Sequence, residues 1–308
     1  MYGESHMNDP AYEVISPTHM LIDVGLDDEI PPFPLIPVTQ LTAKPTPIRW
    51  LIKGLLPEKS ITDVFGAPGS GKTFVVFFMA YCIATGLNWY GKKVKQGLVI
   101  LIIGEGQSGV GMRFKALEIK YGIPAENIIV STQPASLTDE QNALWVADTI
   151  HQHEPALVVI DTLSRNFGGG DENSTKDMTS FVGNLDMTFR RTGKTLAVVH
   201  HVSKGAKGES RGSIVLPSSC ESEFIVEPKQ SEILQFSCRK QKNAAQNDPI
   251  SFKLKTIELP EWPTDEEEVV TSAVLICVDG NNKTSSDKPK RLTARSEQAL
   301  AAISFVLG

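Results

Sequence analysis

Hydrophobic and polar residues alternate along the centre of the chain in a way that predicts strands and helices in turn. Strand-like runs lie at residues 60–65, 97–103, 128–131, 156–161 and 194–201. Between them, apolar residues recur at helical spacing over residues 73–85, 108–121, 138–153 and 175–192. Strands that alternate with helices of this length are typical of a parallel sheet covered by helices.

Two of the predicted strands, residues 97–103 and 156–161, are almost continuously apolar, as expected of parallel strands buried on both faces. The later strand-like segments, residues 222–226, 233–237, 250–254 and 269–278, follow one another without helices between them, which predicts antiparallel additions. We therefore expect an α/β fold in three parts. Residues 1–58 form an N-terminal arm, residues 59–280 the main domain, and residues 281–308 a linker and a C-terminal helix.

A glycine-rich turn joins the first predicted strand to the first helix and fits the pattern G-x-x-x-x-G-K-[ST] of a phosphate-binding P-loop. Its residues are Gly66, Ala67, Pro68, Gly69, Ser70, Gly71, Lys72 and Thr73. Glycines let successive backbone N–H groups converge on phosphate oxygens, and the helix N-terminus favours the negative charge. This pattern predicts ATP binding, with Lys72 on the phosphates and the Thr73 hydroxyl on Mg²⁺.

Two acidic residues follow the apolar strands at the edge of the sheet where ligands bind in open α/β folds. Glu105 lies between two glycines after residues 97–103, where it suits a general base that orients the attacking water or, alternatively, a helix cap. Asp161 ends the strand 156–161 and suits an acid that holds Mg²⁺ opposite Thr73.

The last parallel strand ends in His200 and His201, whose side chains point to opposite faces of the sheet. One of them is expected in the nucleotide cleft, with a slight preference for His201. The next residues, 202–213, are basic and rich in small side chains, which suits a loop on a phosphate backbone or a neighbour's nucleotide. Phe167 is a candidate for stacking, and residues 239–243 read as a cationic turn.

Composition narrows the class of protein only slightly. The formal net charge is −6, which argues against binding nucleic acid over the whole surface but not against a local basic channel. The four cysteines are scattered without metal-binding spacing, which favours reduced thiols and a cytoplasmic location. No apolar run reaches the length of a membrane span, so we expect no membrane partner.

Taken together, the motifs over residues 60–256 resemble the RecA-like P-loop ATPases of the plasmid RepA hexameric helicase type, found in phages and mobile elements. The matching pieces are GAPGSGKT, GEG, LVVIDTLSR, FGGGDENS, AVVHHVSKG, SRGS and KQKN, in that order. The resemblance implies a RecA-like core and a homo-oligomeric ring, usually a hexamer. ATP would lie between the subunits and single-stranded DNA in the pore.

The resemblance also implies roles for individual residues. Glu105 would be the catalytic carboxylate, and His201 or His200 the sensor between the γ-phosphate and the pore. Arg211 would be the arginine finger given to the adjacent subunit, with Lys240 and Lys242 as helpers. Pro217 stands where a longer helix is usual in this family, which leaves the local interface geometry open.

The expected function is that of an ATP-hydrolysing ring that moves on or unwinds DNA, alongside replication proteins. A different class, an ATP-gated assembly factor or helicase loader that does not unwind DNA, fits the same motifs. A P-loop kinase fits less well, because it has no use for a histidine pair or for an arginine supplied by a neighbour.

Overall fold

The structure is a computed structural model that describes residues 35–104, 106–201, 215–230, 232–242, 244–264 and 268–278. The chain divides into two compact units, Met1–Pro47 and Ile48–Gly308. In the first unit, the described part contains the short helix α1 (Val38–Ala43), which has no side-chain cap and buries none of its residues. The sequence pattern of a proline-rich arm did not predict this helix.

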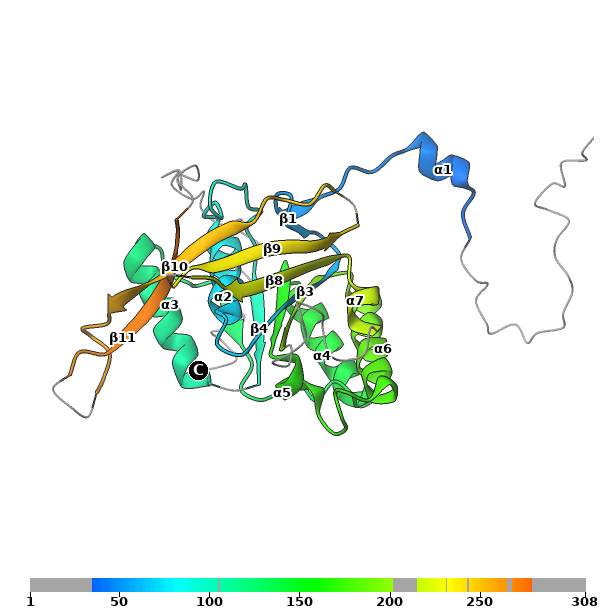
Figure 1. The fold of residues 1–308 in the computed structure, drawn as a ribbon. Coiled ribbons are helices and arrows are strands. Elements are labelled where there is room, and N and C mark those ends of the chain that lie inside the picture. Colours follow the sequence, from blue (N-terminus) through cyan, green and yellow to red (C-terminus); the bar gives the residue numbers. More distant parts are fainter. Residues whose placement is uncertain are drawn as a thin grey trace, which may run out of the picture. The chain divides into compact units, whose positions relative to one another are not determined.

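The second unit is built on a mixed sheet whose described strands run in the order β11-β10-β9-β8-β3-β7-β6-β4-β5 (Figure 1). The six strands from β8 to β5 in that order are parallel. These are β3 (Ile61–Gly66), β4 (Val99–Ile103), β5 (Ile128–Val130), β6 (Leu157–Asp161), β7 (Thr195–His201) and β8 (Ser222–Pro228). The predicted α/β core with a mainly parallel sheet is confirmed.

Three antiparallel strands extend the sheet beyond β8, as predicted. The prediction also counted residues 222–226 among the antiparallel additions, but these residues form β8, which is parallel to β3. They are β9 (Leu234–Gln241), β10 (Ile250–Glu258) and β11 (Thr271–Cys277). One boundary was wrong: Arg239 and Lys240 were expected in a turn, but both lie in β9, where Lys240 pairs with Glu223 of β8. The pairing with β8 continues to the end of β9 and keeps this cationic stretch extended.

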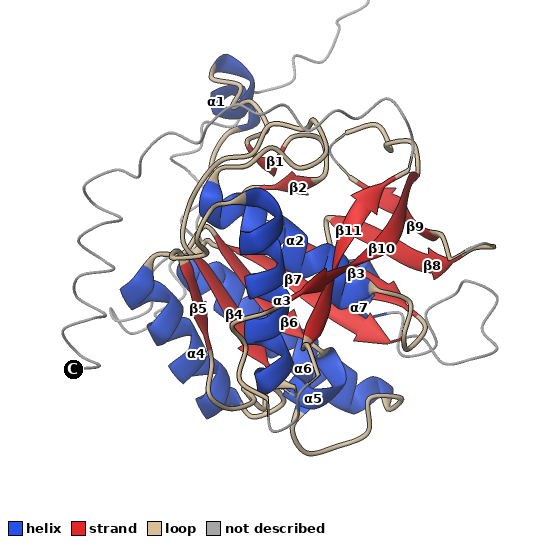
Figure 2. Ribbon diagram, turned by 90° about the vertical axis from the view of Figure 1, so that its left-hand side faces the viewer, coloured by secondary structure: helices blue, strands red, loops and turns tan. Residues whose placement is uncertain are grey.

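Helices cover both faces of the sheet (Figure 2). The apolar clusters place α2 (Lys72–Thr85) and α3 (Gln107–Tyr121) on one face. They place α4 (Glu140–His153), α5 (Leu163–Phe167), α6 (Thr175–Thr192) and α7 (Val215–Ser219) on the other. Alternate residues of β4 and β6 therefore face alternate clusters, which explains why β4 is apolar throughout and β6 is apolar up to its last residue, Asp161.

Local chemistry sets the ends of the helices. The side chain of Asp139 accepts a hydrogen bond from Asn142 N–H and caps α4. Helices α2, α3 and α6 end at Gly86, Gly122 and Gly193, each in the left-handed conformation that glycine adopts without strain. Among the described residues, no helix is both long and apolar enough to cross a membrane.

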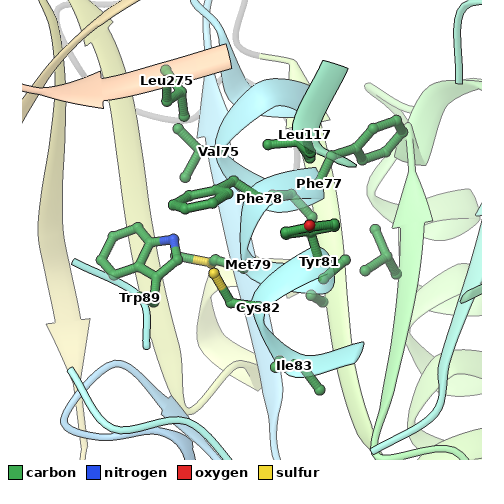
Figure 3. Packing of buried hydrophobic residues seen from close by; sticks show 14 of the residues in the cluster. Val75, Phe77, Phe78, Met79, Tyr81, Cys82, Ile83, Trp89, Leu117 and Leu275 are labelled. Carbon is green, nitrogen blue, oxygen red and sulfur yellow. The ribbon is translucent and has the colours of Figure 1, made fainter. Parts of the chain in front are cut away.

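Helix α2 is buried on nearly all sides, in keeping with its apolar sequence (Figure 3). The antiparallel strands supply part of its cover: the Trp89 ring, just after the helix, packs edge-on against Phe236 of β9 and Phe252 of β10. The Tyr90 hydroxyl donates a hydrogen bond to the Leu275 carbonyl of β11. The strands after the parallel core therefore complete the core around α2.

The small hairpin of β1 (Trp50–Ile52) and β2 (Leu56–Pro57) belongs to the second unit. Its apolar side chains lie in the core around α2: Leu51, Ile52, Leu55 and Leu56. The main unit thus begins at Ile48, whereas the sequence prediction began the main domain at residue 59.

Candidate functional site

A cleft of about 310 Å³ opens at the carboxyl ends of the parallel strands, on the face covered by α2 and α3. Thr73 after β3, Ile103 and Gly106 after β4, Asp161 of β6 and His201 of β7 all line it. The structure therefore brings together residues that the sequence placed on four separate strands. This is the edge at which open α/β sheets bind ligands.

The P-loop backbone leaves room for a phosphate group. Gly69 and Gly71 have φ of +76° and +88°, in the region that favours glycine, and nothing lies within 4 Å of the position a Gly69 Cβ would take. Gly66 is packed tightly instead, because a Cβ there would lie 2.3 Å from the Val226 carbonyl oxygen. The loop is anchored at Gly66 and open at Gly69, as an anion-binding turn requires.

The ammonium group of Lys72 lies inside this turn. Its Nζ donates hydrogen bonds to the carbonyl oxygens of Gly66 at 2.8 Å and Ala67 at 2.9 Å. Burial lowers the pKa of Lys72 to about 8, and the negative charge of Asp161 opposes that shift. A buried ammonium held only by neutral carbonyls gains from an anionic partner, so the site favours a phosphate group.

The donors in the cleft suit a hard divalent cation beside the phosphates. Thr73 and Asp161 line the same cavity, and hydroxyl and carboxylate oxygens are ligands that Mg²⁺ accepts. The nearby Ser70 hydroxyl is buried and has no hydrogen-bond partner among the described residues. These residues fit a nucleotide with bound Mg²⁺.

The two histidines at the end of β7 separate as alternation requires. His201 lines the cleft. The site prediction also included His200, and the structure corrects this. His200 is buried on the opposite face of the sheet, with its Nδ1 3.9 Å from Asp63 Oδ2. His201 is therefore the histidine that can face a bound nucleotide.

Arg113 of α3 also lines the cleft, and sequence reasoning missed it. Its guanidinium lies over the rings of Phe74 and Phe77, 5.4 Å and 5.8 Å from their centroids. The sequence does contain a signal that could have identified Arg113. It follows the buried Val110 by three residues, which places a cation on the otherwise apolar face of α3 that points inward. Arg113 adds a positive charge opposite Thr73 and Asp161.

Other predicted site residues lie elsewhere. Phe167 was expected to stack on a ligand, but it is buried and stacks on Phe181, with ring centroids 5.3 Å apart. The Lys240 ammonium donates to the Pro217 carbonyl of α7, and Lys242 Nζ lies 3.9 Å from Glu221 Oε1. Neither lysine lines the cleft. Glu105 and Arg211 fall outside the described residues.

The family that the sequence matches agrees with a nucleotide site. The AAA domain family AAA_25 matches residues 28–207, which is more than half of the chain and includes the P-loop, Asp161 and His201. A comparison with curated proteins finds no match. Among solved structures, a KaiC-like protein of the hyperthermophilic archaeon Pyrococcus horikoshii OT3 is 14% identical with a TM-score of 0.49, over 68% of this chain and 96% of that one.

Proposed function

Because the chain belongs to the AAA domain family and is a P-loop ATPase, we propose that it assembles into a homo-oligomeric ring, a hexamer, that hydrolyses ATP to move along or unwind single-stranded DNA. The replication of a phage, plasmid or other mobile element is the setting in which such a motor acts. The cytoplasm is the compartment that fits this role.

One observation carries the link from nucleotide to DNA. His201 lines the cleft with Thr73 and Asp161, and it is also the last residue of β7. The next residues in the sequence include three cations and one acid: Lys204, Lys207, Arg211 and Glu209. A change at the γ-phosphate is therefore passed along the backbone directly into a basic segment, whose charge suits a DNA backbone.

In this proposal the residues of the cleft divide the work. The P-loop N–H groups and Lys72 bind the phosphates, while Thr73 and Asp161 hold Mg²⁺, which neutralises phosphate charge when bound. Glu105 orients the attacking water and accepts its proton. Arg211 of an adjacent subunit stabilises the charge of the transition state, with Lys240 and Lys242 supporting it at the same interface.

The experiment that tests this function compares ATP hydrolysis with and without single-stranded DNA. We expect stimulation by DNA, DNA binding that weakens steeply with salt, and displacement of a strand from a tailed duplex. The mass of the assembly with ATP present should be that of six chains. If DNA neither stimulates hydrolysis nor binds in a salt-sensitive way, the helicase proposal fails and the assembly-factor function takes its place.

Arg113 provides a test of the cleft itself. Replacing it, Arg113→Ala, should lower ATP turnover by about 10- to 100-fold, because a charge-assisted contact to the phosphates contributes about 1.5–3 kcal/mol. Steady-state hydrolysis at saturating ATP measures the effect. Arg190→Ala is the matched control, since Arg190 pairs with Asp186 on the exposed face of α6 and should keep full turnover. Equal rates for both variants would remove Arg113 from the site.

A further inference from the structure

Strand β3 carries an unusual residue for the centre of a parallel sheet. The Asp63 side chain is fully buried, three residues before the P-loop begins at Gly66. Neither carboxylate oxygen has a hydrogen-bond partner among the described residues. His200 approaches it from β7, with Nδ1 3.9 Å from Oδ2, and is itself almost fully buried. The two therefore form an ion pair when His200 is protonated.

This pair joins two neighbouring strands, β3, which leads into the P-loop, and β7, which ends at His201 in the cleft. Phe65 of β3 is the register partner of His200, so Asp63 and His200 meet diagonally across two neighbouring strands. Beyond the pair, β3 continues into the P-loop, while β7 continues by one residue to His201. The side chains of the pair face α7, and His201 faces α2 and the cleft. The contact between Asp63 and His200 therefore lies on the face of the sheet opposite to the cleft.

The neighbouring strands extend the polar cluster. Glu223 of β8 is the register partner of Asp63, and Lys240 of β9 is the partner of Glu223. The Lys240 ammonium also donates to the Pro217 carbonyl of α7, which covers this face. Burial raises the pKa of Asp63 and is opposed by His200, while burial and then the charge of Asp63 raise the pKa of Glu223. Asp63 and Glu223 therefore repel each other when both are charged, and the ammonium group of Lys240 offsets part of that repulsion at Glu223.

A buried carboxylate without direct hydrogen bonds costs free energy that an apolar side chain would avoid. Such costs collect at functional positions, because structure alone does not require them. Val64, the next residue of β3, shows the alternative, since it is apolar and buried in the same sheet. Stability alone gives no reason for an aspartate at this position.

We propose that Asp63 is a positioning residue for ATP hydrolysis: through His200 it holds the end of β7, and with it His201, in place relative to the P-loop. The carboxylate does not touch the nucleotide. It holds the last residues of β7 against the end of β3, and hence sets where the His201 ring stands beside Thr73 and Asp161. This role rests on the ATPase activity and not on the DNA-dependent part of the proposed function.

The test uses the full chain and measures ATP hydrolysis without DNA. Asp63→Asn and His200→Asn should each lower kcat about tenfold, because displaced catalytic groups lose rate steeply, while KM for ATP stays within about twofold. The double variant should be no slower than either single variant, since both remove one contact. Rates are expressed per nucleotide-binding site, counted by titration with a fluorescent ATP analogue, so that unfolded protein does not contribute.

Thr62→Val is the matched control. Thr62 is the neighbouring residue of β3, is equally buried, and has a hydroxyl without a partner among the described residues, but it faces the opposite side of the sheet. It should keep the wild-type kcat. If Asp63→Asn does not fold, His200→Asn alone decides the question, because loss of either partner breaks the same contact.

Three results would overturn the inference: a wild-type kcat in the folded single variants, effects that multiply in the double variant, or a loss that vanishes when rates are counted per binding site. A wild-type chain that hydrolyses ATP but ignores DNA would count against the proposed function and leave this comparison intact.

Discussion

Lys72→Ala is expected to reduce ATP turnover by about 10²- to 10³-fold, which is the cost of removing one preorganised donor from a site of developing charge. The reason lies in the P-loop, where Lys72 Nζ is held between the carbonyl oxygens of Gly66 and Ala67 and lies within the field of Asp161. An ammonium placed there before the nucleotide arrives needs little reorganisation to meet the phosphates. Phosphate release at saturating ATP and Mg²⁺ measures the loss.

The matched control is Lys95→Ala. Lys95 forms a surface ion pair with Glu58, with Nζ and Oε2 2.9 Å apart, and does not line the cleft. Surface pairs of this kind contribute about 1 kcal/mol or less, so turnover should be unchanged. Retained turnover in Lys72→Ala would remove the P-loop from the mechanism.

Arg211→Ala is the second substitution with a large expected effect. A transition-state arginine supplied by a neighbour is worth about 10³- to 10⁵-fold in turnover, whereas ground-state nucleotide binding relies on the P-loop. We therefore expect near-complete loss of hydrolysis with ATP affinity largely retained. Equilibrium titration with a fluorescent nucleotide, alongside phosphate release, separates the two effects.

Mixing variants tests whether the arginine acts between subunits. In an equal mixture of Arg211→Ala and Glu105→Gln chains, about a quarter of the head-to-tail interfaces combine an intact Glu105 with an intact Arg211. Part of the activity should therefore return. Chains that carry both substitutions have no intact interface and serve as the control. A mixture that stays as inactive as this control would argue that Arg211 acts within its own subunit or not at all.

The layout of the parallel core was predictable because its physical cause is local. Strands buried on both faces must be apolar along nearly their whole length. This holds for β4 and for β6 up to Asp161, so their sequences mark their position without tertiary information. The caps of α4 and α6 rest on side chains within three residues of the helix start. The P-loop is similarly local, since its glycines and Lys72 serve one turn.

The remaining features depend on contacts between distant parts of the chain. Arg113 reaches the cleft only because α3 packs beside α2, a neighbour relation that helical spacing does not reveal. Phe167 looked like a ligand-binding ring because glycines follow it, yet Phe181 of α6 buries it. The alternation of side chains along β7 predicts that His200 and His201 face opposite sides of the sheet. Which of the two faces the cleft depends on the side on which α2 packs.

The burial of α2 has a consequence for how this chain can fold. The family match ends at residue 207. Trp89, just after α2, nevertheless packs against Phe236 and Phe252, and the Tyr90 hydroxyl donates a hydrogen bond to the Leu275 carbonyl. A chain that ended at residue 207 would expose to water the aromatic residues that follow α2, Trp89 and Tyr90. We therefore expect the smallest fragment of this ATPase that folds on its own to extend past residue 207, where the family match ends, through β11.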